Sequence, residues 1–547
     1  MVSHLIGVDI GTSGLKTALV HAEAGVLAVA ERSYPLHRPA TAWAENDPED
    51  WYRALVDTVH EIVARAGVPP ATVLALCIVA QRDQFVLLDG AGRVLTPAIH
   101  WTDRRDPEET ERLYAQLGRE RLIHITGVIP IPGLGLPNLV WTKRHLPDIW
   151  RQVRWALPIK DYLAYRLTGD IGTDVSSTSR SVLNDWRRMD WSDEICAEVG
   201  IPREILPPVR YRPSEARAEL DSYAAATLGL APGTILAAGG GDDQAATLAC
   251  GVIDVGDVSI GTGTSTCWRT VTDHGSEDER GLADYSPHVV PGRFIAEVTI
   301  AGAGTSLRWF RDVFGFSETR PETHSSYEEL LTEAEAIEPG AEGLLFYPYL
   351  DGSRLPYYDE EIRGVFFGII PGHRRAHFVR SIMEGIAYSY PPLIDILTDS
   401  GLPVGKLTIV DGEARSRAWN ALKAHVTGRE IHTTGVVEAA AVGAAILAGM
   451  ACGIFRTAAD GVAALATPGD IYVPDPALHA RYQTLRERWE AVRPHLFAAA
   501  HASIPSGPRL TPDALSGDRS ATSKEDTPCQ NDLTTLPGPH AGLAGAT

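Results

Sequence analysis

Two short polar turns contain the residue types that can bind phosphate groups. They are GTSG at 11–14 and GTGT at 261–264, and Asp9 and Lys16 flank the first of them. Small residues let the backbone approach phosphate oxygens, and exposed N–H groups supply partial positive charge. Neither turn matches the GxxxxGK[ST] pattern, so this is no P-loop, and a plain turn is the alternative at each place.

The segment GGGDDQ at 239–244 could supply a general base. Three glycines end an apolar strand, and two adjacent carboxylates, Asp242 and Asp243, begin a helix. A helix N-terminus favours an ionised carboxylate, and an ionised aspartate beside a cleft can accept a hydroxyl proton. A helix N-cap is the alternative reading, but it explains one aspartate and not the three glycines before it.

Polar side chains also follow the strands predicted at TVLALCIVA, FVLLD and VLTPAIHW. If these strands form an antiparallel meander, the loop QRDQ at 81–84 and the segment after Trp101 return to the same edge. The sequence then predicts a cluster of Gln81, Arg82, Asp83, Asp103 and Arg105. The alternative is a set of loop charges that form ion pairs with one another.

The elements that must position these residues occur twice along the chain. HLIGVDI, LKTALVHA and GVLAVAERSY predict three strands, and a helix follows from the N-cap Asp47 and Pro48 to Gly67. Around 235–263 the chain again gives a strand, a glycine-rich stop, a helix and a hairpin. Two related α/β domains that face one cleft are the simplest architecture.

Composition excludes several classes of partner. The net charge of −21 argues against nucleic acid and acidic membranes. The longest apolar run, 439–455, is under ~20 residues and rich in alanine and glycine, which predicts a close-packed helix and no membrane span. The cysteines are scattered and form no CxxC pairs, which predicts free thiols. The N-terminus lacks the character of a signal peptide, so we expect a cytoplasmic protein.

The C-terminal segment has a different composition. From about 501 it is rich in Pro, Ser, Thr, Gly and Ala and contains no aromatic residue. Such a segment cannot bury enough apolar surface to offset chain entropy. We therefore expect domains at 1–250 and 251–495 and a disordered tail at 496–547.

Longer motifs give the chain a resemblance to a known family. The segment GVFFGIIPGHRRAHFVRSIMEG resembles the C-terminal signature of the FGGY carbohydrate kinases, which belong with actin and hexokinase in one superfamily of two-lobed ATP-binding folds. The resemblance covers roughly residues 5 to 495. Its other motifs are WAENDPEDWY at 43–52, WTDRR at 101–105, KDYLAYRLTG at 160–169, GAGTSLRWFRD at 302–312 and EAAAVGAAI at 438–446.

The resemblance implies a fold, a reaction and site residues. The fold is α/β, with two actin-like (ribonuclease H-like) lobes around a central nucleotide and substrate cleft. ATP and Mg²⁺ are the implied cofactors, a small sugar or polyol is the acceptor, and a homodimer is left open. Asp242 falls at the catalytic base and Asp9 near the metal, while Gln81, Arg82, Asp83, Asp103 and Arg105 fall at the sugar site. The implied nucleotide contacts are Gly11, Thr12, Ser13, Lys16, Gly261, Thr262, Gly304, Gly412 and Ser416.

Two positions depart from the family pattern. Glu413 stands where the family's adenosine motif, which DGEARS at 411–416 resembles, usually has a glycine, so we expect it to hinder the nucleoside and expect Glu413→Gly to tighten ATP binding. Asp243 stands where relatives often carry Asn or Gln. Two adjacent carboxylates can share a proton, which would raise the apparent pKa of the pair.

The implied substrate is a short neutral molecule. Gln81-Arg82-Asp83 resembles glycerol-kinase-like members, whereas WTDRR and GGGD resemble the pentulose kinases. An arginine fork and a carboxylate suit vicinal hydroxyls. We expect a pentulose such as xylulose, narrowly ahead of glycerol or a four-carbon polyol. A kinase for a non-sugar alcohol and a nucleotide-dependent binding or scaffold protein of the same fold also stay open.

Overall fold

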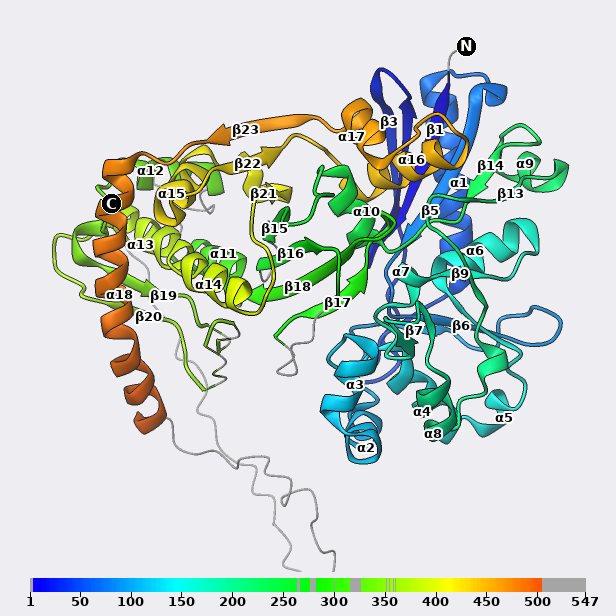
Figure 1. Cartoon of the computed structure of the whole chain (residues 1–547), viewed down its shortest axis with the longest axis horizontal. Helices are drawn as coiled ribbons and strands as arrows, with labels where there is room; N and C mark the ends of the chain where they lie inside the picture. The colour runs from blue at the N-terminus through cyan, green and yellow to red at the C-terminus, as the bar shows by residue number, and fades with distance from the viewer. Residues whose placement is uncertain are drawn as a thin grey trace, which may run out of the picture. The chain divides into compact units, whose positions relative to one another are not determined.

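The computed structural model describes residues 3–262, 266–275, 282–300, 302–314, 326–350, 352–353, 355–357, 359 and 361–503. Two large mixed sheets organise these residues and lie in separate halves of Figure 1. The first sheet has the order β13 (Ala216–Glu219), β14 (Ile235–Ala237), β5 (Val73–Ala80), β1 (His4–Ile10), β2 (Gly14–His21) and β3 (Gly25–Ser33). The second has the order β17 (Asp284–Pro287), β18 (Phe294–Ile300), β16 (Thr266–Thr272), β15 (Val258–Thr262), β21 (Leu407–Val410), β22 (Ile431–Thr434) and β23 (Pro468–Tyr472).

The two sheets repeat one pairing pattern. In the first, β3, β2 and β1 are antiparallel, β5 and β14 continue parallel to β1, and β13 closes the edge antiparallel. In the second, β18, β16, β15, β21, β22 and β23 follow the same sequence of directions. The prediction of two related α/β domains is therefore confirmed, and each opens with a hairpin, β1–β2 or β15–β16.

Helices connect and cover the strands. In α1 (Pro48–Ala66), Asp47 accepts a hydrogen bond from the Glu49 N–H at 2.9 Å, and Gly67 ends the helix with φ of 63°, as predicted. The other helices are α2 (Pro107–Leu117), α3 (Arg119–Thr126), α4 (Gly135–His145), α5 (Pro147–Trp150), α6 (Ile159–Thr168), α7 (Val175–Thr178), α8 (Asp193–Val199), α9 (Ser222–Leu228), α10 (Asp242–Ala249), α11 (Ala303–Phe314), α12 (Tyr327–Glu335), α13 (Arg375–Ala387), α14 (Tyr390–Asp399), α15 (Arg417–Thr427), α16 (Ala439–Ala451), α17 (Ala458–Leu465) and α18 (Pro476–Ser503).

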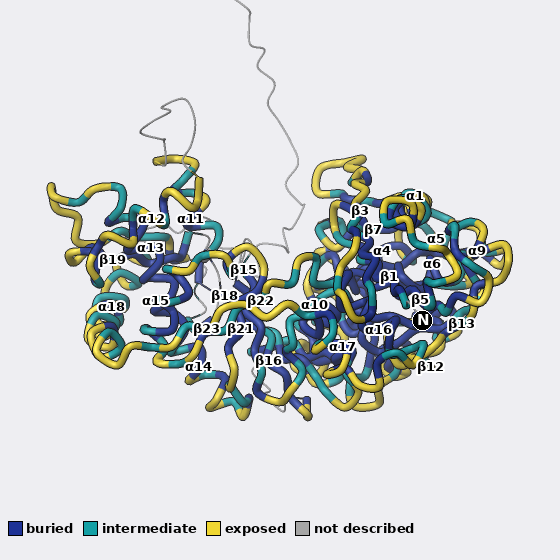
Figure 2. Tube along the Cα trace, turned by 90° about the horizontal axis from the view of Figure 1, so that it is seen from above, coloured by how far each residue is buried: buried dark blue, intermediate teal, exposed yellow. Residues whose placement is uncertain are grey.

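One helix from the second half of the chain packs on the first sheet. The predicted close-packed helix is α16, which lies beside β1 in Figure 1 and is buried with it in Figure 2. A Cβ on Gly7 would lie 1.8 Å from the Ala441 carbonyl oxygen, and one on Gly443 would lie 1.9 Å from that of Ala245. Glycine at these positions therefore lets α16 approach both β1 and α10. Among the described helices, none has the length and apolarity of a membrane span.

The predicted meander around the loop 81–84 is wrong. After α1, β5 enters the first sheet parallel to β1 and is flanked by β14 on its other side, so it has no free edge. The strand β6 (Phe85–Leu88) instead pairs with β8 (Trp155–Pro158), and β7 (Ala98–Ile99) pairs with β4 (Glu45–Asn46). The remaining short pairs are β9 (Thr173–Asp174) with β12 (Val209–Tyr211), β10 (Asn184–Asp185) with β11 (Asp190–Trp191), and β19 (Leu345–Tyr347) with β20 (Val365–Phe367).

The expected start of the tail at 496 is also wrong. Helix α18 continues to Ser503, and the Phe497 ring packs edge-on against Tyr349 and Tyr357, with centroids 5.4 and 6.0 Å apart. This aromatic contact explains why the helix extends past the predicted boundary. The rest of the predicted tail, 504–547, lies outside the described residues, as does Cys529. The five described cysteines are free.

We expect two truncations to differ in stability. Removal of everything after residue 503 leaves the urea midpoint of unfolding unchanged, because the deleted composition cannot contribute a core. Removal of everything after 495 lowers the midpoint, because it also deletes the half-buried Phe497 side chain, and full burial of such a side chain contributes about 1.5–3 kcal/mol. Equal midpoints for the two truncated proteins would contradict this assignment.

Candidate active site

The first polar turn is the tip of the β1–β2 hairpin. The Gly11 N–H donates to the Gly14 carbonyl at 3.0 Å, which closes the turn. Thr12 and Ser13 are exposed at its tip. The Thr12 hydroxyl accepts a hydrogen bond from Trp101 at 3.2 Å, and the phosphate-binding role of the turn stays a prediction.

Asp9 and Lys16 face each other across this hairpin. The Lys16 ammonium forms a 2.7 Å ion pair with Glu438, the residue before α16. The Oδ1 atom of Asp9 is buried and has no hydrogen-bond partner among the described residues. Burial and the carboxylate of Asp242 raise the pKa of Asp9 well above its ordinary value, although Lys16 opposes the shift. A carboxylate oxygen in this position suits a hard divalent cation, which would relieve the repulsion.

The glycines of GGGDDQ allow three chain segments to meet. Gly239 follows β14 with φ of 72°, and a Cβ there would lie 1.9 Å from the Ile78 carbonyl oxygen. A Cβ on Gly241 would lie 2.6 Å from the side chain of Arg82. The glycines therefore allow the start of α10 to pack against β5 and against the loop that carries Arg82. A helix N-cap alone would not require this close packing.

The two carboxylates at the start of α10 have opposite electrostatic environments. Asp243 accepts hydrogen bonds from Arg82 at 3.0 Å and from Arg269 at 2.8 Å, and these guanidinium groups lower its pKa to about 2. Burial and the charge of Asp243 raise the pKa of Asp242 to about 7. Asp242 can thus exchange a proton near neutral pH, while Asp243 stays ionised and joins the loop after β5 to β16 of the second sheet.

Three of the predicted sugar-site residues lie in the loop 81–84, and one of them, Arg82, contacts Asp243 directly. Arg82 donates to Asp243 and, at 3.2 Å, to the Ser179 hydroxyl, and its side chain is only 5% exposed. Asp83 accepts from Arg180 at 3.0 Å. The buried Oε1 atom of Gln81 has no hydrogen-bond partner among the described residues. The loop 81–84 therefore presents polar groups next to Asp242, despite the wrong strand pairing.

Asp103 and Arg105 form a separate buried ion pair. Arg105 donates to Asp103 through Nε at 3.0 Å and Nη2 at 2.8 Å, and to Glu45 at 2.7 Å. Its guanidinium lies 3.8 Å from the ring centroid of Trp43, and the side chains of Arg105 and Asp103 are 3% and 0% exposed. These contacts favour the alternative of an internal ion pair, so a role for these two residues in sugar binding stays a prediction.

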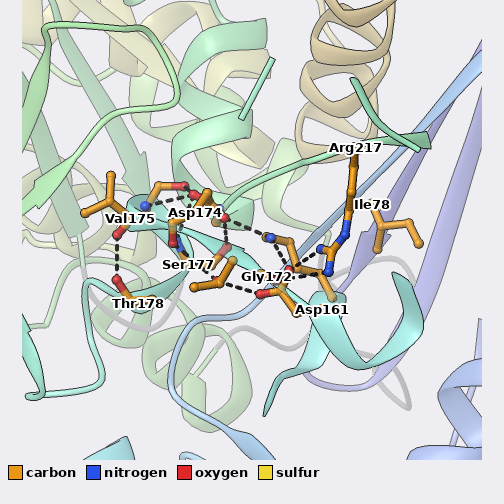
Figure 3. A network of polar contacts seen from close by, with 12 residues as sticks. Ile78, Asp161, Gly172, Asp174, Val175, Ser177, Thr178 and Arg217 are labelled. Carbon is orange, nitrogen blue, oxygen red and sulfur yellow. Dashed lines mark hydrogen bonds and ion pairs between the residues drawn. The ribbon is translucent and has the colours of Figure 1, made fainter. Parts of the chain in front are cut away.

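A buried polar network supports the backbone of the GGGDDQ segment. Figure 3 shows Asp161 and Asp174 within this network; Lys160 binds Asp161 at 2.7 Å and Asp174 at 2.9 Å. The Ser176 hydroxyl donates to Asp174 and accepts from the Gly241 N–H at 3.2 Å. The KDYLAYRLTG motif therefore contributes to positioning the residue directly before Asp242.

The second predicted turn belongs to the β15–β16 hairpin. Thr262 and Thr266 pair at the end of the hairpin, and residues 263–265 lie outside the described part of the chain. A Cβ on Gly261 would lie 2.9 Å from the carboxylate of Asp411, in the adenosine motif. This motif and the hairpin are therefore neighbours, as the implied nucleotide site requires.

Two adjacent cavities are lined by three of the predicted residues, Asp9, Gly261 and Gly412. One, of about 460 Å³, is lined by Asp9, Gly412 and Glu438, and the other, of about 330 Å³, by Asp243, Gly261 and Arg269. Both are lined by Ala246, Cys250, Asp411 and Ala439, so they adjoin. Gly304 lies in α11, and Ser416 directly precedes α15; neither lines these two cavities.

The prediction assigned no role to several charged residues of the site. Glu438, the partner of Lys16, is the first residue of the quoted EAAAVGAAI motif, so a signal for it was present. Arg269 is a charged residue in a largely apolar strand after the second turn, which is a weaker signal. Arg180 lies in a polar segment whose sequence does not indicate its contact with Asp83.

Models of one protein family match both halves of the chain. The N-terminal domain of the FGGY family of carbohydrate kinases matches residues 4–249, and the C-terminal domain of that family matches residues 258–452. The chain belongs to the FGGY family of carbohydrate kinases. The prediction of a carbohydrate kinase with two α/β lobes is therefore confirmed, and a scaffold protein without sugar phosphorylation is set aside.

Relatives of this kinase carry more than one substrate name. The xylulose kinase of Bacillus subtilis (strain 168) is 30% identical over 494 residues, which cover 90% of this chain and 97% of the relative. The gluconokinase of the same organism is 27% identical, with 82% of this chain and 87% of the relative covered. The crystal structure of xylulose kinase from Rhodospirillum rubrum has a TM-score of 0.83 and 28% identity, and the match covers 91% of this chain and 100% of that one.

Proposed function

We propose that this kinase transfers the γ-phosphoryl group of ATP to a hydroxyl group of a small neutral sugar, with a pentulose such as xylulose favoured. The observation that carries the proposal is the position of Asp242. Its pKa of about 7 suits a general base, and it lies beside the polar loop 81–84 and next to Asp243, which lines the cavity that adjoins the one with Asp9. The relatives named xylulose kinase support the choice of sugar.

The chemistry follows from the groups around Asp242. Its carboxylate accepts the proton of the substrate hydroxyl as that oxygen attacks the γ-phosphorus in line with the departing ADP oxygen. Arg82 can donate to one hydroxyl of the sugar and Asp83 can accept from another. Asp243 holds Arg82 in place through their 3.0 Å ion pair. The acceptor hydroxyl is thus oriented before transfer, which disfavours water as a competing acceptor.

The residues present fit a magnesium ion bound together with the nucleotide. Asp9 offers a buried oxygen without a protein partner among the described residues, in a cavity that also contains Gly412 of the adenosine motif. The described residues include no cluster of three or more His, Cys, Asp or Glu side chains arranged for a metal. Phosphate oxygens and water would therefore complete its coordination, and the ion would neutralise charge on the phosphates.

Charge balance favours a neutral sugar over a sugar acid. The arginines near Asp242 all have acidic partners: Arg82 pairs with Asp243, Arg180 with Asp83 and Asp284, and Arg269 with Asp243 and Glu297. A substrate carboxylate would have to displace one of these partners and would face the remaining carboxylates. Glycerol or a tetritol is the second candidate, because Arg82 and Asp83 resemble the glycerol-kinase pattern.

A coupled assay of ADP release tests the substrate. We expect a much higher kcat/KM for xylulose or another ketopentose than for glycerol, tetritols, aldohexoses or gluconate. A hydrophilic site built to pair each hydroxyl discriminates strongly against a molecule that lacks one. A preference for gluconate or a hexose would contradict the proposal.

The pH profile tests the role of Asp242. Because its pKa is about 7, the fraction of deprotonated base falls below neutrality. We expect kcat/KM for the sugar to reach a plateau in weak base and to fall about tenfold per pH unit well below pH 7.

Asp243→Asn should move this acidic limb to lower pH, because the charge of Asp243 raises the pKa of Asp242. Protonation of ATP affects the assays of both proteins equally. A difference between the two pH profiles therefore comes from a group of the enzyme. A profile that stays flat between pH 5 and 8, or that is identical in the variant, would contradict the assignment.

A further inference from the structure

Glu413 does not lie where its place in the adenosine motif suggests. It belongs to the short 3₁₀ segment Asp411–Arg415, between β21 and α15, and is only 8% exposed. The neighbouring Gly412, Ala414 and Arg415 line the larger cavity, whereas Glu413 does not. The expected hindrance of the nucleoside by Glu413 is therefore wrong, because the side chain points into the lobe.

A buried lysine neutralises this carboxylate. Glu413 forms an ion pair with Lys423 of α15, and the side chains of the two residues are 4% and 0% exposed. The Lys423 ammonium also lies 4.8 Å from the ring centroid of Trp419 and 5.8 Å from that of Tyr390. Loss of one partner from such a pair would leave an uncompensated buried charge. The two side chains therefore depend on each other, and we expect Glu413→Gly to lower the stability of the protein.

The same carboxylate accepts a hydrogen bond from the Thr262 hydroxyl. Thr262 Oγ1 donates to Glu413 Oε2 at 2.5 Å and lies 2.9 Å from the Thr266 hydroxyl. A hydroxyl group has one proton, so Thr266 must donate to Thr262 when Thr262 donates to Glu413. In this arrangement the Thr262 side chain has no proton left for a phosphate oxygen.

We propose that Glu413 is a positioning residue that, neutralised by Lys423, ties the Thr262 hydroxyl to the adenosine motif and so fixes the end of β15. The inference rests on the proposed nucleotide site. Glu413 connects the loop that precedes α15 with the end of β15, two segments that the parallel pairing of β15 and β21 already brings together. The nucleoside and phosphate contacts are thereby held in one geometry.

Four proteins test the proposal: the wild type, Lys423→Met, Glu413→Gln, and the variant with both changes. Calorimetric titration with ADP and Mg²⁺ in the absence of sugar is the main readout. Lys423→Met leaves an unneutralised carboxylate next to the phosphate site, so we expect ADP to bind about tenfold more weakly. Adding Glu413→Gln removes that charge and keeps an acceptor for Thr262, so most of the affinity should return.

The kinetic pattern separates positioning from a general structural role. For Lys423→Met we expect the KM for ATP to rise and the KM for the sugar to stay near its wild-type value. A double variant that binds ADP as weakly as Lys423→Met would overturn the proposal. If Lys423→Met does not fold, the double variant decides, and tenfold weaker ADP binding by that protein would overturn it. Because ADP binding needs no sugar, failure of the proposed substrate is distinguishable from failure of this inference.

Discussion

Asp242→Asn should lower sugar-dependent phosphoryl transfer by about 10²–10⁴-fold, the usual contribution of a general base. Asparagine keeps the size of the side chain and an oxygen that can accept the 2.8 Å hydrogen bond from the Asp243 N–H. It cannot take a proton from the substrate hydroxyl. The measurement is kcat with saturating ATP and sugar, together with the ADP affinity, which should stay within a few-fold of the wild type.

Asp193→Asn is the matched control for this variant. Asp193 is also the first residue of a helix, α8, but its side chain is 62% exposed and it lines neither of the two cavities. We expect wild-type turnover for the control. Near-normal turnover of Asp242→Asn would show that Asp242 is not the base, and Asp243 would then become the candidate.

The second large effect is expected for Arg82→Met. This change removes hydrogen bonds to an ionised partner, each worth about 1.5–3 kcal/mol, so kcat/KM for the sugar should fall about 100-fold. Arg82 also holds Asp243 and Ser179, so its loss frees both groups beside the bound sugar. ADP affinity should change much less, because Asp9 and the first hairpin are untouched.

Arg188→Met provides the control, because Arg188 pairs with Asp193 at the surface, where both side chains are more than half exposed. Such surface pairs contribute little. A loss of ADP affinity in Arg82→Met as large as the loss in kcat/KM for the sugar would place Arg82 in a general structural role. If kcat/KM of Arg82→Met for the sugar stays within threefold of the wild type, Arg82 does not bind the sugar.

Local sequence patterns predicted the parts of the site that single segments build. The β1–β2 hairpin, α1 with its Asp47 cap, and the start of α10 after three glycines are all present. In each case the determinants lie within a few residues of one another: turn residues, a cap, or a glycine that permits close approach. The two adjacent aspartates also indicated an unusual pKa, and the structure assigns the raised value to Asp242.

Long-range pairing explains what the sequence could not show. Nothing near Arg105 reveals that Trp43 and Glu45 will enclose it, and nothing near Glu413 reveals a buried lysine ten positions later. The strand pairing of β6 and β7 likewise depends on partners far along the chain. Phe497 extends α18 through contacts with residues more than a hundred positions earlier. Such contacts depend on how the whole chain packs, which local composition does not determine.

Phosphorus NMR of a reaction mixture tests the central claim most directly. ATP, Mg²⁺ and xylulose are incubated with the wild type or with Asp242→Asn, and the products are followed over time. We predict one sugar phosphate monoester for each ATP converted to ADP by the wild type, and little of either product with the variant. Inorganic phosphate without a sugar ester, or equal ester formation by the two proteins, would contradict a base-assisted transfer to the sugar by Asp242.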